Sequence, residues 1–126
     1  MPIEIINGGL VIAGLVIGGT FADIDLAPPL PLRHRSAWTH GPLIPLALWS
    51  AIALHPYVFW FALGFLPANA IHLLKDCFPK RWHGGAKISL YPFTQWRLPA
   101  LPSMLYLLAG VGASAWPVTT VLLNLT

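Results

Sequence analysis

Charged residues are scarce in this chain. Of its 126 residues, 9% are charged and only 4 are acidic, whereas 56% are hydrophobic and the mean hydropathy is +0.69. A soluble domain usually carries about 25% charged residues, and at this length it exposes much of its surface. So few charges would hardly cover that surface, which excludes an ordinary soluble domain and favours a membrane protein with a single domain, residues 1–126.

Cysteine and clustered positive charge are also lacking. Cys77 is the only cysteine, so an internal disulfide framework and a multi-cysteine zinc site are excluded. The net charge of +3 is small and scattered along the chain, so no nucleic-acid partner is expected. No Lys or Arg precedes the first apolar run. The positive region of a signal peptide is therefore missing, and we expect a retained transmembrane helix.

Long apolar segments dominate what is present. They predict helices at about 5–21, 39–54, 56–76 and 98–123. A membrane span needs about 20 apolar residues, with a range of about 17–25, so the first two segments are short. Because proline disfavours helix at the residue before it, His55-Pro56 is expected to form a tight turn between the second and third helices. The predicted fold is an all-α membrane protein, a bundle of about four transmembrane helices in a lipid bilayer.

The basic residues predict the orientation of this bundle. All of them lie in or beside two connections, 22–38 and 77–97; they are Arg33, Arg35, Lys75, Lys80, Arg81, Lys87 and Arg97. With four spans the two connections share one face, and the excess of Lys and Arg on cytoplasmic loops places that face in the cytoplasm. Both termini and the turn at 55–56 are then non-cytoplasmic, in a membrane of the bacterial inner-membrane type.

Small residues predict a packing face on the first helix. Gly14 and Gly18 form a GxxxG pair, a spacing that lets two helices approach closely in lipid. The last apolar segment has no ionisable residue between Arg97 and the C-terminus. We therefore expect that segment to act as a scaffold.

The scarce ionisable residues gather at the predicted cytoplasmic end. Two acids follow the first helix, two histidines flank the start of the second, and a His–Asp pair at i,i+4 spacing ends the third; these are Asp23, Asp25, His34, His40, His72 and Asp76. Acidic residues at membrane depth are costly and usually functional. Crowded carboxylates repel one another unless they are protonated or neutralised. This convergence is the main functional signal in the sequence.

Two kinds of site account for the convergence. A divalent metal would neutralise the carboxylates and also use the imidazoles, and this ligand set suits Zn, Mn, Fe or Ni, with zinc as the first choice. Alternatively, Arg33, Arg35 and Lys75 would form an ion-pair network with the aspartates. Other polar residues are given ordinary roles: Thr39 as a helix N-cap, His55 as a turn residue, His83 as a solvated loop residue and Cys77 as an inert thiol.

Several short motifs, taken in order, carry a family resemblance. Asp23-Ile24-Asp25, then HRSAWTHG at 34–41, IHLLKD at 71–76 and ISLYPF at 88–93 together resemble the small membrane-bound metal-dependent hydrolases. These include the LexA-binding inner-membrane hydrolase family and related membrane metal-binding proteins. The resemblance spans roughly residues 20–95 and implies that the six gathered residues are the metal-site candidates. The chain departs from the family pattern at Ala22, Gly41 and Lys75, where proline, serine and an apolar residue are usual.

Two functions are compatible with these residues. The first is metal-dependent hydrolysis of a phosphoester or lipid-like substrate at the cytoplasmic interface. One of the aspartates would then act as general base, and Asp25 is the first candidate. Arg35 would stabilise the negative charge that develops on the substrate. The alternative is a non-enzymatic small subunit of a larger membrane complex, or a homo-oligomer. Its aromatic residues would contact a pigment or cofactor, and its metal site would be structural or vestigial.

Overall fold

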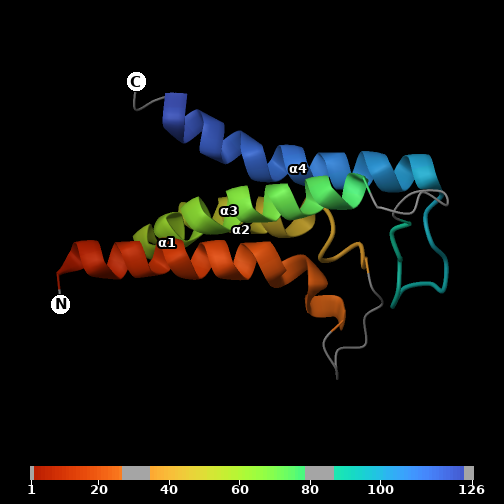
Figure 1. Cartoon of the computed structure of the whole chain (residues 1–126), viewed down its shortest axis with the longest axis horizontal. Helices are drawn as coiled ribbons and strands as arrows, with labels where there is room; N and C mark the ends of the chain where they lie inside the picture. The colour runs from red at the N-terminus through yellow and green to blue at the C-terminus, as the bar shows by residue number, and fades with distance from the viewer. Residues whose placement is uncertain (1, 27–34, 79–86, 124–126) are drawn as a thin grey trace.

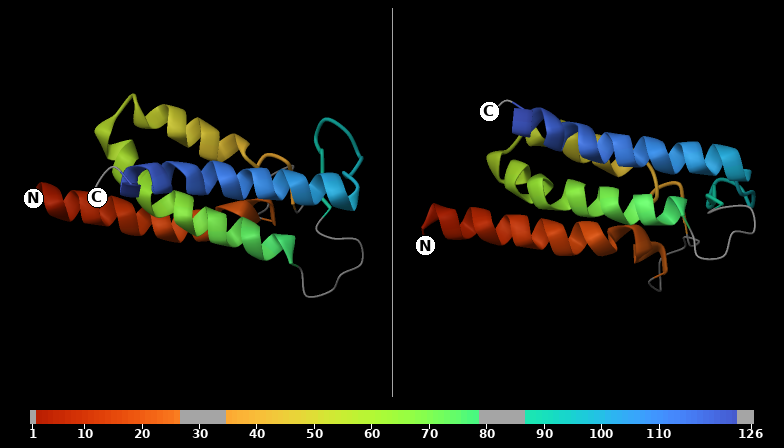
Figure 2. Two further views of the ribbon diagram at one scale, coloured as in Figure 1. Left: turned by 90° about the horizontal axis from the view of Figure 1, so that it is seen from above. Right: turned by 45° about the horizontal axis from the view of Figure 1, so that its top comes forward.

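The chain folds into a helical bundle. The computed structural model describes residues 2–26, 35–78 and 87–123. Four α-helices and one 3-10 helix follow in order: α1 (Ile3–Thr20), η1 (Phe21–Leu26), α2 (Leu43–Ile52), α3 (Pro56–Cys77) and α4 (Ala100–Leu123). Because these residues contain no β-strand, the expected all-α class is confirmed. Figures 1 and 2 show α3 between α1 and α4, and α3 also contacts α2.

The turn between α2 and α3 forms where the sequence predicts it. His55 has an extended backbone and caps α3, because its Nδ1 accepts a hydrogen bond from the Tyr57 N–H at 3.3 Å. Pro56 occupies the first helical position, where its missing N–H costs nothing and its fixed φ suits a helix. The long apolar stretch is therefore divided into two helices, and His55 is the turn residue that was expected.

The second helix is shorter than its apolar segment predicts. It begins at Leu43 instead of 39, because residues 36–42 form turns. The N–H groups of Thr39 and His40 donate to the carbonyl of Ser36 at 3.1 and 3.0 Å, and Pro42 then precedes the helix. The 10 residues of α2 extend about 15 Å, roughly half the thickness of a bilayer core. The expected second span is thus only a short apolar helix.

Glycines bring the backbones of α1 and α3 together. A Cβ added to Gly14 would lie 2.8 Å from the Phe65 nitrogen, and one added to Gly18 would meet the backbone of Phe65. From the other side, a Cβ on Gly64 would lie 2.8 Å from the Leu15 nitrogen. The expectation that Gly14 and Gly18 form a packing face is confirmed, and Gly64 is the matching small residue on α3.

Both described connections lie at one end of the bundle, called here the polar end. Residues 35–37 pair with Ser89: the Ser89 N–H donates to the Arg35 carbonyl at 2.8 Å, and the Ala37 N–H donates to the Ser89 carbonyl at 2.9 Å. The start of α1 and the end of α4 lie at the opposite end (Figure 1). The prediction that the two basic connections share one face therefore holds for the residues described.

Residues 88–98 form a hairpin-like loop at the polar end. The Leu98 N–H donates to the Ile88 carbonyl at 2.8 Å, and the Leu90 N–H donates to the Trp96 carbonyl at 3.1 Å. The hydroxyl of Ser103 in α4 accepts from the Ile88 N–H at 3.0 Å and so ties the loop to the bundle. Ile88 is fully buried and packs in one apolar cluster with Leu73 of α3.

Two helices have the length and composition of membrane spans. Among the described residues these are Ile3–Ile24, which joins α1 to part of η1, and Pro56–Cys77. In the most apolar 18-residue windows of these helices, 17% of the first and 33% of the second is fully buried. The first exposes Ile12 and Val16 among others, whereas the apolar residues of α3 are mostly buried or half-buried. By length and composition, these two helices could cross a membrane.

Candidate metal centre

Four polar side chains meet at the polar end of the bundle. They come from three segments that are distant in sequence: Asp23 from η1, His40 from the turns before α2, and His72 with Asp76 from the last turns of α3. Asp23, His40 and His72 form a group that could hold a metal ion, because their ligand atoms lie within 4.8 Å of one another. The structure thus brings together four of the six residues predicted from the sequence.

His72 is oriented by the end of α1. Its Nδ1 lies 2.8 Å from the carbonyl oxygen of Gly19. The last carbonyls of a helix have no partner within that helix and can accept such a bond. Because a carbonyl oxygen can only accept, Nδ1 carries a proton, and in the neutral ring Nε2 has the lone pair. That Nε2 lies 3.7 Å from Oδ2 of Asp76 and 3.7 Å from Oδ1 of Asp23.

His40 is fixed more tightly, in the interior. It is fully buried, and its Nδ1 lies 2.9 Å from the hydroxyl oxygen of Thr39. Since the Thr39 hydroxyl donates its own proton to the Ser36 carbonyl at 3.4 Å, it can accept from Nδ1. Nε2 of His40 then faces Oδ2 of Asp76 at 3.2 Å. Gly41 allows this placement, because a side chain there would collide with the ring of Tyr106.

The Asp76 carboxylate is the shared neighbour of the two imidazoles. Both Nε2 atoms lie near its Oδ2. In neutral rings protonated on Nδ1 these nitrogens would face the oxygen with lone pairs, whereas a ring protonated on Nε2 would donate to it. Oδ2 and Nε2 of His40 are shielded from solvent, so water does not relieve the repulsion. A cation between these atoms, or a proton on each Nε2, would relieve this repulsion. The arrangement therefore suits positive charge among these atoms, carried by a metal ion or by protonated imidazoles.

The separations of these atoms suit a small divalent cation. Ligands bound tetrahedrally at about 2.0–2.1 Å lie about 3.4 Å from one another. Three of the separations here are 3.2, 3.7 and 3.7 Å, and the ligand atoms of Asp23, His40 and His72 all lie within 4.8 Å of one another. Neutral imidazole nitrogens with carboxylate oxygens are a donor set that zinc accepts. The Asp23 side chain is 47% exposed, so this side of the group is open to solvent.

The ion-pair alternative also has a counterpart in the structure. A terminal nitrogen of Arg35 lies 3.6 Å from Oδ1 of Asp76, while Oδ2 faces the histidines. Arg35 has a φ of 60°, a left-handed conformation that costs a non-glycine residue about 1–2 kcal/mol. The hydrogen bonds of its segment to Ser89 hold it there. Because the two oxygens of Asp76 face different partners, the Arg35 contact and a cation site are compatible.

Several predicted site residues lie outside this geometry. Asp25 belongs to η1, but its side chain is outside the described part of the structure, and His34, Arg33 and His83 are outside the described residues altogether. Thr39 was expected to cap a helix; instead its hydroxyl bonds His40, because α2 begins four residues later. Cys77 is 4% exposed, in keeping with the inert role expected of it.

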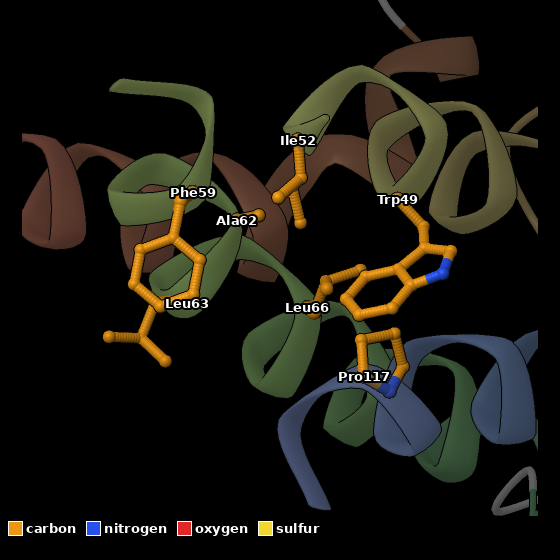
Figure 3. Close-up of a pocket in the computed structure, with 7 residues that line it drawn as sticks. All are labelled: Trp49, Ile52, Phe59, Ala62, Leu63, Leu66 and Pro117. Carbon is orange, nitrogen blue, oxygen red and sulfur yellow. The ribbon is translucent and has the colours of Figure 1, made fainter. Parts of the chain in front are cut away.

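An apolar recess lies in the other half of the bundle. Figure 3 shows its lining, which comes from α2, α3 and α4 and contains no ionisable side chain: Trp49, Ile52, Phe59, Ala62, Leu63, Leu66 and Pro117. The recess therefore offers hydrophobic contact but no acid, base or ligand atom for chemistry. The polar end is the better candidate for a reactive site.

Comparison with family models, with curated proteins and with solved structures gave no match for this chain. The functional interpretation consequently rests on the geometry of the polar end and on the motifs themselves.

Proposed function

We propose that the chain is an integral membrane protein that binds one divalent cation, with zinc as the first choice, at a cytoplasmic polar end. The ligands would be His40, His72, Asp76 and Asp23. One observation carries this proposal: each histidine has its Nδ1 on a protein oxygen, and each directs its Nε2 toward the same carboxylate oxygen. Partners of this kind on the second ring nitrogen fix the tautomer and orientation of metal-binding histidines.

We further propose that this site is a hydrolase that acts on a phosphoester or lipid-like substrate at the membrane interface. When bound, a divalent cation activates water and polarises a phosphoryl or acyl oxygen. In this chain Asp23 would form the solvent-facing side of the site, and Asp25, two residues along in η1, would accept the proton as general base. Arg35 would hold Asp76 in position and offer its remaining N–H groups to developing negative charge.

Hydrolysis is tested with purified, metal-loaded protein and a chromogenic phosphoester. We expect turnover that a chelator abolishes and added zinc restores. Asp25→Asn should lower turnover by about 10²–10⁴-fold, the usual contribution of a general base, while the protein keeps its metal. Phosphoester release that is insensitive to the chelator, or unchanged in Asp25→Asn, would contradict the proposed activity.

A structural cation in a subunit of a larger complex is the second candidate. The contact between Arg35 and Asp76 favours it, because an arginine that already neutralises one ligand leaves less positive charge for a substrate. In that case the purified protein would retain its metal but hydrolyse no phosphoester, and it would leave the membrane with other chains in mild detergent.

A further inference from the structure

Three exposed aromatic side chains lie on the two connections at the polar end and are called here the aromatic patch. Trp38 precedes α2, and Phe93 and Trp96 lie at the tip of the 88–98 loop; their exposed fractions are 41%, 76% and 78%. The rings of Trp38 and Phe93 pack together, with centroids 5.6 Å apart. The contact between Trp38 and Phe93 thus joins the two connections.

The aromatic patch belongs to a basic part of the chain. Lys87 and Arg97 lie at the base of the 88–98 loop, and both are exposed. In the sequence no acidic residue follows Asp76, whereas Lys80, Arg81, Lys87 and Arg97 do. The loop thus combines large exposed rings with the positive charges of Lys87 and Arg97, and it contains no acidic residue.

The backbone holds the aromatic patch in a fixed place. The loop is bonded internally through Leu90 and Trp96, to α4 through Ser103, and to residues 35–37 through Ser89. It lies just beyond the end of α3 and beside the start of α4 (Figure 1). If α3 crosses a bilayer over Pro56–Cys77, the loop lies at the level of the lipid headgroups.

We propose that the aromatic patch contacts the anionic headgroup region of the membrane, with Phe93 and Trp96 inserted among the upper acyl chains and with Lys87 and Arg97 on the phosphates. Tryptophan is enriched at this boundary because its ring is apolar and its N–H is polar. Basic residues beside a membrane are attracted to anionic lipids. The positive charge of the loop therefore favours an anionic lipid surface as the partner of the patch. This contact is separate from the metal site and does not depend on it.

The proposal is tested with a nitroxide attached at Phe93→Cys in vesicles of phosphatidylglycerol and phosphatidylcholine. The native Cys77 is 4% exposed, so labelling of the folded protein should reach mainly the new cysteine, and wild-type protein treated in parallel gives the background. We expect collisions with oxygen to exceed collisions with a water-soluble nickel chelate, as for a position below the phosphates. In a Lys87→Gln, Arg97→Gln background the label should move toward water in the anionic vesicles only.

Two results would overturn the lipid contact. Free access of the nickel chelate to the label would place the loop in water, and protection from both relaxants would show that a protein surface, such as a second copy, covers it. If Phe93→Cys does not fold, tryptophan quenching by lipids brominated near the headgroup replaces the label. Trp96→Phe should then lose a large share of the quenchable fluorescence, and an unchanged share would reject the proposal. Metal content is expected to remain unchanged throughout.

Discussion

Replacing His72 by alanine is expected to weaken zinc binding by at least about 100-fold. Loss of a hydrogen-bond partner behind a ligand lowers metal affinity by about 10–100-fold, and loss of a direct ligand should cost more. His72 contributes a ring nitrogen that faces both Asp23 and Asp76. Its removal leaves one imidazole and exposes two carboxylates to mutual repulsion. Titration of purified, metal-free protein with zinc against a competing chelator measures the change.

Two further variants test whether the effect is specific to the site. His55→Ala removes a histidine at the opposite end, where it only caps α3, and zinc affinity should remain that of the wild type. Thr39→Val keeps the shape of the side chain beside His40 but removes the hydroxyl that meets Nδ1. An affinity about 10–100-fold lower is expected from the loss of such a partner. Equal zinc binding by wild type and His72→Ala would exclude His72 as a ligand.

A side chain at Gly64 is expected to break the crossing of α1 and α3. Its Cβ would run into the Val11 carbonyl and approach the Leu15 nitrogen, and a helix backbone cannot move aside as a flexible side chain can. Overpacking of a core costs about 1–3 kcal/mol, and we expect Gly64→Ala to reach the upper part of that range. Gly64→Leu should prevent the bundle from forming. Unfolding in mixed detergent micelles, followed by circular dichroism, measures both variants.

Glycines elsewhere on α1 provide the matched control. A Cβ at Gly8 or Gly9 would meet nothing within 4 Å. Alanine is favoured over glycine inside a helix by about 0.5–1 kcal/mol, so Gly8→Ala and Gly9→Ala should leave stability unchanged or slightly raised. A Gly64→Ala variant as stable as Gly9→Ala would show that the backbones do not approach as described.

Local sequence signals predicted much of the fold and part of the site. The His55-Pro56 turn, the close packing at Gly14 and Gly18, and the shared face of His72 and Asp76 each follow from residue type or from helical spacing. Such features depend on neighbours within one or two turns of the chain, which the sequence displays directly.

Other features depend on contacts between distant segments and were not predicted. The Gly19 carbonyl that orients His72 is a backbone group, so the identity of the residue does not predict this contact. The left-handed Arg35 is held by Ser89, more than fifty residues away. The shortening of α2 follows from the turns around Ser36 and from the packing of Gly41 against Tyr106.

X-ray absorption at the zinc edge of zinc-loaded protein tests the shared cation most directly. The account predicts only nitrogen and oxygen ligands at about 2.0–2.1 Å. The outer-shell scattering should correspond to two imidazole ligands in the wild type and to one in His72→Ala. A sulfur ligand at about 2.3 Å, the absence of imidazole scattering, or a purified protein that takes up no zinc would contradict it.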